Sequence, residues 1–308
     1  MFKALITSFV LLLGICFSLY ETSNVADHSI FFTRDENIYD VIKKDKSFKV
    51  GLLFFIANSI DYIRRRMQTG EYIVHYNETA ISVLQKVFNG NNITHKITIP
   101  EGLTTQMIVE ILNKNDLLMG EIKEIPEEGS IMPSTYFYKF HDTKESIIIK
   151  MKNQMTQIIS RIQRQNSTNL SMKEILILAS IIEKEVKLEE ELELVSSVFH
   201  NRLRKKMRLQ SCPTVIYSIS NGYGKINRKL TKEDTSFKGP FNTYRVAGLP
   251  PTPICCPGEK AINAAMNPKH TNFLYFVLSP DYKHHYFSID YKTHNKRKKA
   301  IANTTNSN

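Results

Sequence analysis

The sequence predicts an α+β protein with an N-terminal membrane helix, then small strand-turn-helix modules, and finally a larger α+β domain. Three observations lead to this prediction: an uncharged apolar run at the N-terminus, three short β-type runs each followed by helical periodicity, and a helix-rich second half. The 308 residues, 42% of them hydrophobic, are enough for two modest domains with packed cores. We expect a transmembrane anchor over residues 1–20, α/β modules over 28–130 and an α+β domain over 131–300.

The N-terminal run from Ala4 to Tyr20 carries no charge, with Lys3 before it and Glu21 after it. A membrane-spanning helix needs about 17–25 apolar residues, so this run is at the lower limit of spanning length. A cleaved signal peptide, whose apolar core is about 7–15 residues long, is the alternative. Positive charge stays on the cytoplasmic side of a membrane. We therefore expect a single-pass protein of the inner (plasma) membrane, with the chain from Glu21 onward outside the cytoplasm.

The chain is basic, with 41 Lys and Arg against 30 Asp and Glu and a formal net charge of +11. Such an excess is typical of proteins that meet nucleic acid, anionic lipid or an acidic polymer. An extracytoplasmic body without any recognisable nucleic-acid motif disfavours DNA and RNA. The four cysteines include no CxxC pair and are too few for a disulfide scaffold. A basic segment over 292–299 is predicted to be solvated surface.

Three segments before residue 115 share one pattern, in which a short β-type run leads through a polar turn into helical periodicity. They are Ile30–Thr33 with Ile38–Lys44, Glu71–Val74 with Thr79–Phe88, and Lys96–Ile99 with Leu103–Leu112. In the third segment, Thr104 or Thr105 is the expected N-cap. The pattern predicts small α/β modules and leaves open whether they only pack or also bind glycan. Glu, Gly and Pro residues over 115–135 indicate a hinge or domain boundary.

A capping box, Ser171 with Glu174, begins the most informative predicted helix. The residues over 175–182 are nearly all apolar, so the helix is expected to be buried on all sides. Glu183 and Glu185 follow, about 160° apart around the helix, and cannot share one small site. A carboxyl group beside aliphatic side chains has a raised pKa and can act as a general acid. The alternative is a frayed helix-end Glu paired with a lysine.

The run from Ala179 to Glu185, Ala-Ser-Ile-Ile-Glu-Lys-Glu, resembles a signature of the YceG-like family of endolytic murein transglycosylases. The resemblance extends over roughly residues 28–300, because further motifs follow in the family's order. They are Pro133–Tyr136, Val195–Leu203, Met207–Gln210, Pro213–Tyr217, Asn242–Tyr244, Gly248–Ile254, Pro257–Gly258, Ala261–Pro268, Leu274–Val277, His285–Phe287 and His294–Asn295. The Lys96–Gly102 segment resembles the family's LysM-like module. The resemblance thus implies a LysM-like unit within 28–130 and a YceG-like catalytic domain over 131–300.

Three positions depart from the family pattern. Ser134 and Cys212 stand where Asp is usual, and Cys256 stands where Asn is usual. These departures put polar contacts near the site in doubt, but not the glutamate. A disulfide from Cys212 to Cys255 or Cys256 is permissible outside the cytoplasm and is left open.

The resemblance implies an enzyme, a peptidoglycan lytic transglycosylase and thus a lyase. Family members break the β-1,4 bond between N-acetylmuramic acid and N-acetylglucosamine within glycan strands. The sugar's own 6-hydroxyl attacks the anomeric carbon, which leaves a 1,6-anhydro end. Carried over to this chain, Glu183 is the acid/base, and one carboxylate suffices because the substrate supplies the nucleophile, whereas hydrolases use two. Such an enzyme terminates or trims nascent strands.

Five polar side chains are candidates for binding the sugar and acetamido groups: Gln210, Thr214, Tyr217, Asn242 and Tyr244. Each can equally be a turn or packing residue. Asn201 and Arg202 are expected to hold the helix of Glu183 in place. Expected partners are peptidoglycan glycan strands, the membrane and the cell-wall synthesis machinery.

No cofactor and no metal are expected. His284, His285 and His294 are near one another in sequence, but their spacing matches no zinc pattern. Two rival functions remain: a wall-binding scaffold of the same fold that has lost catalysis, and a basic nucleic-acid binder. A Glu183 confined at the end of an apolar helix favours the enzyme, and an exposed Glu183 favours the scaffold.

Overall fold

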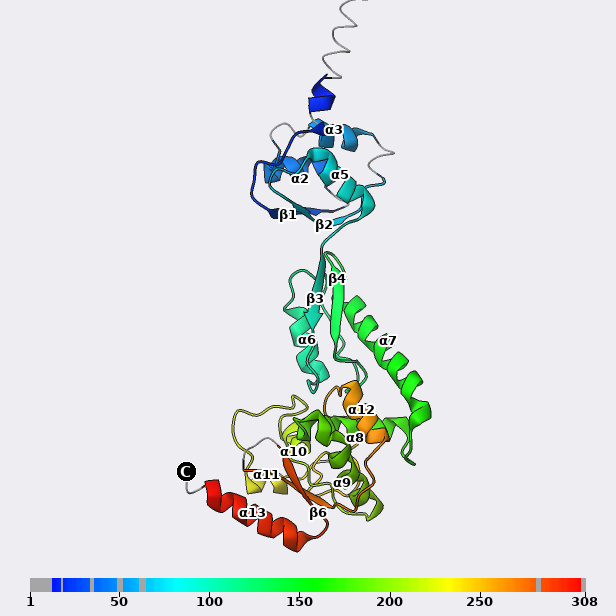
Figure 1. Cartoon of the computed structure of the whole chain (residues 1–308), viewed down its shortest axis with the longest axis vertical. Coiled ribbons are helices and arrows are strands. Elements are labelled where there is room, and N and C mark those ends of the chain that lie inside the picture. The colour runs from blue at the N-terminus through cyan, green and yellow to red at the C-terminus, as the bar shows by residue number, and fades with distance from the viewer. Residues whose placement is uncertain are drawn as a thin grey trace, which may run out of the picture. The chain divides into compact units, whose positions relative to one another are not determined.

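The structure is a computed structural model that describes residues 13–17, 19–33, 36–48, 52–60, 65–280 and 284–305. Within these residues the chain is α+β, as predicted, with three two-stranded sheets set among helices (Figure 1). The chain divides into two compact units. The first lies within residues 1–97 and adds 117–119 and 137–142; the second consists of 98–116, 120–136 and 143–308.

The predicted membrane anchor over residues 1–20 falls largely outside the described residues. In the part of the chain that the structure does describe, no helix combines the length and the apolar character needed to cross a bilayer. The anchor stays a prediction.

Among its described residues, the first unit contains an antiparallel pair of strands and short helices. Strand β1 (His28–Phe32) pairs with β2 (Gly70–Val74), and Ile30 lies opposite Tyr72. The helices are α2 (Ile38–Asp45), α3 (Leu52–Ser59) and α5 (Ala80–Asn89). The predicted strands and helices of the first two modules are therefore confirmed, although α3 was not expected. The two predicted strands pair with each other, so these modules form one core rather than two.

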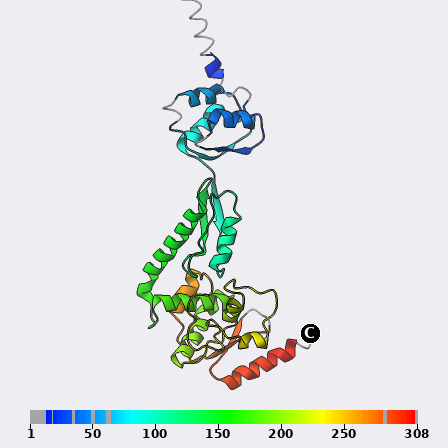
Figure 2. The same ribbon diagram turned by 180° about the vertical axis from the view of Figure 1, so that it is seen from behind.

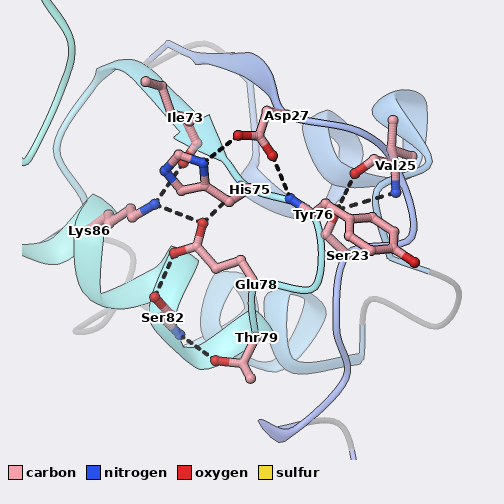
Figure 3. Close-up of polar contacts among 10 residues, drawn as sticks. All are labelled: Ser23, Val25, Asp27, Ile73, His75, Tyr76, Glu78, Thr79, Ser82 and Lys86. Carbon is pink, nitrogen blue, oxygen red and sulfur yellow. Dashed lines mark hydrogen bonds and ion pairs between the residues drawn. The ribbon is translucent and has the colours of Figure 1, made fainter.

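Polar contacts close the end of the first unit where β2 turns into α5 (Figure 3). Asp27 accepts hydrogen bonds from the Tyr76 backbone N–H and from Nδ1 of His75, each at 2.8 Å. Glu78 accepts from the His75 backbone N–H at 3.0 Å and from Lys86 Nζ at 2.7 Å. Ser82 Oγ donates to the same carboxylate at 2.6 Å. These bonds fix the turn to the first two turns of α5.

The third predicted module is also confirmed at the level of its elements. Strand β3 (Thr94–Thr98) pairs with β4 (Thr135–Lys139), and the boundary between the two units crosses both strands. Helix α6 (Thr105–Asn113) begins after Thr104, whose hydroxyl accepts the Met107 N–H and makes it the N-cap. A LysM-like character of these segments stays a prediction.

The second unit is built mainly from helices. After α6, its helices and strands are α7 (Lys144–Ile162), η1 (Gln163–Gln165), α8 (Met172–Glu185), η2 (Glu189–Glu191), α9 (Leu192–Arg204), α10 (Cys212–Ile219), α11 (Lys232–Ser236), α12 (Glu259–Met266), β5 (Tyr275–Leu278), β6 (His285–Ser288) and α13 (Tyr291–Thr305). Both views show α8 and α12 side by side (Figures 1 and 2). The core of this unit lies between α8, α9 and α12.

Helix α8 is buried as its sequence predicts. The capping box is present: the Ser171 hydroxyl accepts the Glu174 N–H, and the Glu174 carboxylate accepts the Ser171 N–H at 2.8 Å. From Ile177 to Ile182 every residue is buried. The helix ends at Glu185, because the next residue, Val186, is extended. The buried helix therefore delivers Glu183 to its last turn.

Two side chains of α9 hold it to neighbouring segments. Asn201 Nδ2 donates to the carbonyls of Thr271 and Phe273, each at 2.9 Å. Arg202 Nε donates to the Leu274 carbonyl at 2.7 Å, and its Nη1 donates to the Leu209 carbonyl at 2.6 Å. Since α9 packs against α8, these bonds support the helix of Glu183 through its neighbour.

The division between the units differs from the predicted boundary at 130/131. Residues 98–116 and 120–130 belong to the second unit. The physical reason is a short backbone ladder: the Gly102 N–H donates to the Cys256 carbonyl at 3.0 Å, and the Cys256 N–H donates to the Leu103 carbonyl at 2.8 Å. Sequence separation concealed this pairing.

Candidate active site

Glu183 lies in the last turn of α8, half-buried, where the segment 254–258 crosses the helix. Ser180, one turn earlier, holds that segment in place. Its hydroxyl accepts the Ile254 N–H at 3.0 Å, and its carbonyl accepts a contact from Cys255 Sγ at 3.3 Å. The crossing segment therefore reaches Glu183 in a fixed position.

Gly258, the N-cap of α12, donates its backbone N–H to Glu183 Oε2 at 3.0 Å. The same glycine also makes room for a second carboxylate. A Cβ added to Gly258 would lie 1.9 Å from Oε1 of Glu101. Glu101 is exposed and directly precedes Gly102. The backbone ladder between Gly102 and Cys256 therefore places Glu101 next to Gly258. Two carboxylates, Glu101 and Glu183, thus meet at one backbone position.

The pKa of Glu183 is raised, chiefly because burial disfavours the charged carboxylate. The Gly258 N–H opposes this by stabilising the anion, the charge of Glu101 raises the pKa further, and Lys184 lowers it. Lys184 itself is tied down, since its Nζ donates to the Gly102 carbonyl at 3.0 Å. The site therefore disfavours ionisation of Glu183 relative to an exposed glutamate, while keeping a hydrogen-bond donor for the carboxylate.

Glu185 faces a different set of groups, as the helical spacing predicted. Its carboxyl group is enclosed, although the residue as a whole is half-buried, and Ser211 Oγ donates to it at 2.6 Å. Burial raises its pKa, and the Ser211 bond and the charges of His285 and Arg202 oppose the rise. Glu183 and Glu185 do not form a paired site.

A third enclosed carboxylate, Glu128, lies near the crossing segment. It accepts the Thr105 N–H at 3.0 Å and the Tyr217 hydroxyl at 3.4 Å. Cys256 Sγ contacts it at 3.7 Å. Burial raises the pKa of Glu128, and these hydrogen bonds oppose that rise. Tyr217, one of the five predicted sugar-binding residues, is thus linked to the segment that carries Gly258.

The other four predicted sugar-binding residues lie around the loop that follows α9 and the loop at 242–244. Gln210 is exposed at a positive φ of 51°, and its N–H donates to the Thr243 carbonyl. Thr214 is fully buried and its hydroxyl bonds to the Ser211 carbonyl and Thr243. Direct contact of either residue with sugar stays a prediction.

Asn242 and Tyr244 lie on the second of these loops. Asn242 is fully buried, and its amide donates to the carbonyls of Thr235 and Phe237. Its Oδ1 accepts the Tyr244 N–H at 2.9 Å. The Tyr244 hydroxyl lies 3.2 Å from Sγ of Cys212, which follows Ser211, the hydrogen-bond partner of Glu185. Asn242 shapes the loop that carries Tyr244.

The three cysteines of the second unit are free thiols. Cys212 is exposed, whereas Cys255 and Cys256 are buried. The structure therefore contains no disulfide between Cys212 and either Cys255 or Cys256, the pairing that the sequence left open.

The clustered histidines serve packing and hydrogen bonding. His285 Nδ1 lies 2.6 Å from Glu191 Oε2, and His294 stacks on Tyr275. Among the residues that the structure describes, no group of three or more His, Cys, Asp or Glu side chains is arranged to hold a metal ion.

Glu101 and Glu128 belong to the site, although no sequence motif marked either residue as a member. Glu101 lies within the Lys96–Gly102 segment, which stood out only for its resemblance to a LysM-like module. Glu128 lies in the Glu-, Gly- and Pro-rich stretch interpreted as a hinge. The ladder between 102–103 and 256 brings the first stretch to the segment that carries Gly258, and the contacts of Glu128 with Thr105 and Cys256 bring the second.

Comparison with known proteins decides the family. The family model described as "YceG-like family" matches residues 34–300 of the chain. The chain belongs to the YceG-like family. This confirms the resemblance found in its sequence motifs.

Two relatives of this YceG-like chain carry the name endolytic murein transglycosylase. The protein from Bacillus subtilis (strain 168) is 29% identical over 301 residues, which is 87% of this chain and 80% of that protein. The protein from Streptococcus pneumoniae serotype 2 is 32% identical over 175 residues, 55% of this chain and 31% of that protein. Less than a third of the pneumococcal protein is thus aligned.

A solved structure is also similar. It is the crystal structure of a putative YceG-like protein from Listeria monocytogenes, with a TM-score of 0.55 and 27% sequence identity. The match covers 88% of this chain and 98% of that one. The α+β fold of the YceG-like chain is therefore shared with an experimental structure.

Proposed function

We propose that this chain is an endolytic murein transglycosylase that cleaves the β-1,4 bond between N-acetylmuramic acid and N-acetylglucosamine and leaves 1,6-anhydro ends. The single observation that carries the proposal is Glu183, a largely enclosed carboxyl group with a raised pKa that retains one backbone donor at 3.0 Å. The names of the two relatives support the same reaction class.

In the first half of the proposed reaction Glu183 is the general acid. Because Oε2 accepts the Gly258 N–H, the proton belongs on Oε1. That proton passes to the glycosidic oxygen as its bond to the anomeric carbon breaks, and positive charge develops at the anomeric carbon. The nearby carboxylate of Glu101 offers negative charge to this centre.

In the second half Glu183 is the general base. The carboxylate takes the proton of the sugar's 6-hydroxyl while that oxygen bonds to the anomeric carbon, so no water is consumed. The Gly258 N–H and the N-terminal end of α12 stabilise the carboxylate between the two steps. One residue can thus serve as acid and then as base, because burial favours one state and the backbone donor favours the other.

The proposed setting follows from the sequence. A single-pass anchor over residues 1–20 would hold the body on the extracytoplasmic face of the plasma membrane, where nascent strands are made. There the enzyme would terminate or trim strands beside the wall-synthesis machinery. We assign sugar contacts to Gln210, Tyr217 and Tyr244, with Thr214 in the same helix as Tyr217 and Asn242 in the loop that carries Tyr244.

The test is mass spectrometry of peptidoglycan digested by the full chain in detergent micelles, beside its Glu183→Gln variant. The proposal expects anhydromuramic ends from the first protein and a loss of at least about 1000-fold in the second, because a general acid/base contributes about 10²–10⁴-fold per step. Glu145→Gln, on the exposed surface of α7, is the matched control and should cleave at the wild-type rate.

The Glu185→Gln variant tests whether catalysis depends on Glu183 alone or also on the second glutamate of α8. It should retain more than about a tenth of the activity, since Glu185 bonds to Ser211 and takes no part in the proposed proton transfers. Reducing ends in place of anhydro ends would indicate a hydrolase and overturn the mechanism. Absence of cleavage by a folded wild-type chain would leave the wall-binding scaffold as the better account.

A further inference from the structure

A second polar feature of the second unit lies apart from Glu183. A cavity of about 1130 Å³ is lined by α9, by the segment 167–170 before α8 and by the segment 268–274 after α12. Ligand pockets usually have volumes of about 300–1,000 Å³, so this cavity has room for more than one sugar or amino acid.

The cavity wall is basic. His200, Arg204, Lys205, Lys269 and His270 line it, and its described lining includes no Asp or Glu. His200 Nε2 lies 2.8 Å from the Ala265 carbonyl, and burial lowers the pKa of this ring, which disfavours its charged form. The positive charge therefore comes from Arg204, Lys205 and Lys269.

Two of these cations are available to a ligand. Lys205 and Lys269 are exposed, and neither has a carboxylate partner among the described residues. Arg204 donates to Asn201 Oδ1 through one nitrogen, which leaves the rest of its guanidinium fork available. Cationic groups without carboxylate partners in a concave surface attract anions more strongly than they would on an open surface.

The wall is also preformed. Asn201 holds the carbonyls of Thr271 and Phe273, and Ser197 bonds to the Thr271 hydroxyl. Ser167 fixes the opposite side, because its backbone N–H and hydroxyl both donate to the Met266 carbonyl. A ligand would therefore meet a shaped site and would have little loop ordering to oppose its binding.

The remaining lining distinguishes a peptide from a lone anion. Leu170, Leu203, Leu274 and Ile289 add apolar surface between the charged groups, and Ile289 is 57% exposed. A simple phosphate site gathers its donors on one point, usually backbone N–H groups in a nest or at a helix N-terminus. Here the cations are spread among aliphatic and amide side chains, which suits an extended ligand with methyl groups and separated carboxylates.

The cavity lies at the other end of α8 from Glu183. Leu170 lines the cavity and precedes the helix, whereas Glu183 is in its last turn. The twelve helical residues from Met172 to Glu183 span about 18 Å at 1.5 Å per residue. A ligand group bound there is therefore far from the bond that Glu183 breaks, which favours a stem on another sugar of the strand.

We infer that this cavity binds the free carboxylates of an acidic peptide, and that in the proposed substrate this peptide is the stem carried by a sugar several positions from the scissile bond. The inference rests on the proposed function for the identity of the peptide. The cavity selects strands that bear stems.

The test is isothermal titration of the full chain with N-acetylmuramoyl tetrapeptide, which contains no glycosidic bond and cannot be cleaved. Lys205→Gln/Lys269→Gln should weaken binding at least tenfold, and raised salt should weaken it as well. Lys232→Gln, an exposed lysine in α11 outside the cavity lining, is the matched control and should bind as wild type. The same tetrapeptide with amidated carboxylates should bind at least tenfold more weakly than the free acid.

Three results would overturn the inference: no binding of the muramoyl tetrapeptide, equal binding of its amidated form, or displacement by inorganic phosphate at equal concentration and ionic strength. The last would identify a simple anion site. Because the probe is not a substrate, the outcome is independent of catalysis. If the chain binds the muramoyl tetrapeptide but releases no anhydro ends from peptidoglycan, the peptide site stands and the proposed activity is wrong. If it releases anhydro ends but does not bind the tetrapeptide, the activity stands and the peptide site is wrong.

Discussion

The carboxyl groups of Glu101 and Glu183 meet at the backbone of Gly258, although 82 positions separate Glu101 from Glu183 in the sequence. Glu183 accepts the glycine N–H, and Glu101 occupies the space where a side chain at 258 would begin. Because like charges disfavour each other's ionisation, Glu101 helps to keep Glu183 protonated. The pKa of the acid is thus raised by a residue from a segment that sequence motifs place in a different part of the chain.

Replacing Glu101 should change the pH dependence of cleavage. Glu101→Gln removes the negative charge that raises the pKa of Glu183, so that pKa falls. A general acid is active below its pKa, so the alkaline limb of the pH–rate profile should move to lower pH. The measurement is the rate of anhydro-end formation across pH 4.5 to 9. Glu145→Gln should leave the limb unmoved, and a shift of the Glu101→Gln limb to higher pH would contradict the relationship.

Gly258→Ala should reproduce the Glu101→Gln shift. The new Cβ would lie 1.9 Å from Glu101 Oε1, and the exposed carboxylate can swing away. The backbone tolerates alanine, since φ at Gly258 is −75°, although an alanine N-cap costs α12 about 1 kcal/mol. The double variant should show one shift rather than two, because both changes remove the same charge. Additive shifts would mean that Gly258 acts on Glu183 in another way.

The elements of the chain were predictable because they are encoded locally. The capping box at Ser171 and the N-cap at Thr104 each depend on residues within one turn, and both are present. The helical spacing of Glu183 and Glu185 also predicted that they would have different partners.

Long-range placement was not predictable. The ladder between Gly102 and Cys256 is a backbone interaction and leaves no periodic signal in the side chains. From the local pattern alone, Glu101 was assigned to the third strand-turn-helix module and Glu128 to a hinge. The basic cavity was missed for a similar reason, since its cations come from α9 and from the 268–274 segment.

Arg202→Lys should destabilise the second unit by about 2–4 kcal/mol. Arg202 is 6% exposed and donates from two different nitrogens to the carbonyls of Leu274 and Leu209. A lysine ammonium is a single point and cannot reproduce that fork, so a buried carbonyl loses its partner. Urea unfolding followed by circular dichroism measures the change. Arg208→Lys, at an exposed arginine, should stay within about 0.5 kcal/mol of wild type, and equal effects of both changes would contradict the role of Arg202.

Glu185 should make the stability of the second unit depend on pH. Its folded-state pKa is raised above the ordinary value of 4.5 by burial. A raised pKa means that the folded state holds the proton more tightly. The resulting stabilisation is complete below pH 4.5 and is lost as pH rises through the folded-state pKa. Each unit of that rise corresponds to about 1.4 kcal/mol.

Glu185→Gln removes this dependence, because glutamine does not ionise and can still accept the Ser211 hydroxyl bond. Relative to wild type, the variant should therefore gain free energy of unfolding as pH rises from 4.5 to 8. The chain offers a reporter in each unit: Met155 is 3% exposed in the second core, and Met67 is 9% exposed in the first. Methionine oxidation measured across a urea series should show the gain at Met155 and none at Met67. A difference between variant and wild type that is constant with pH would mean that Glu185 has the same pKa in the folded and unfolded chain, and would contradict the prediction.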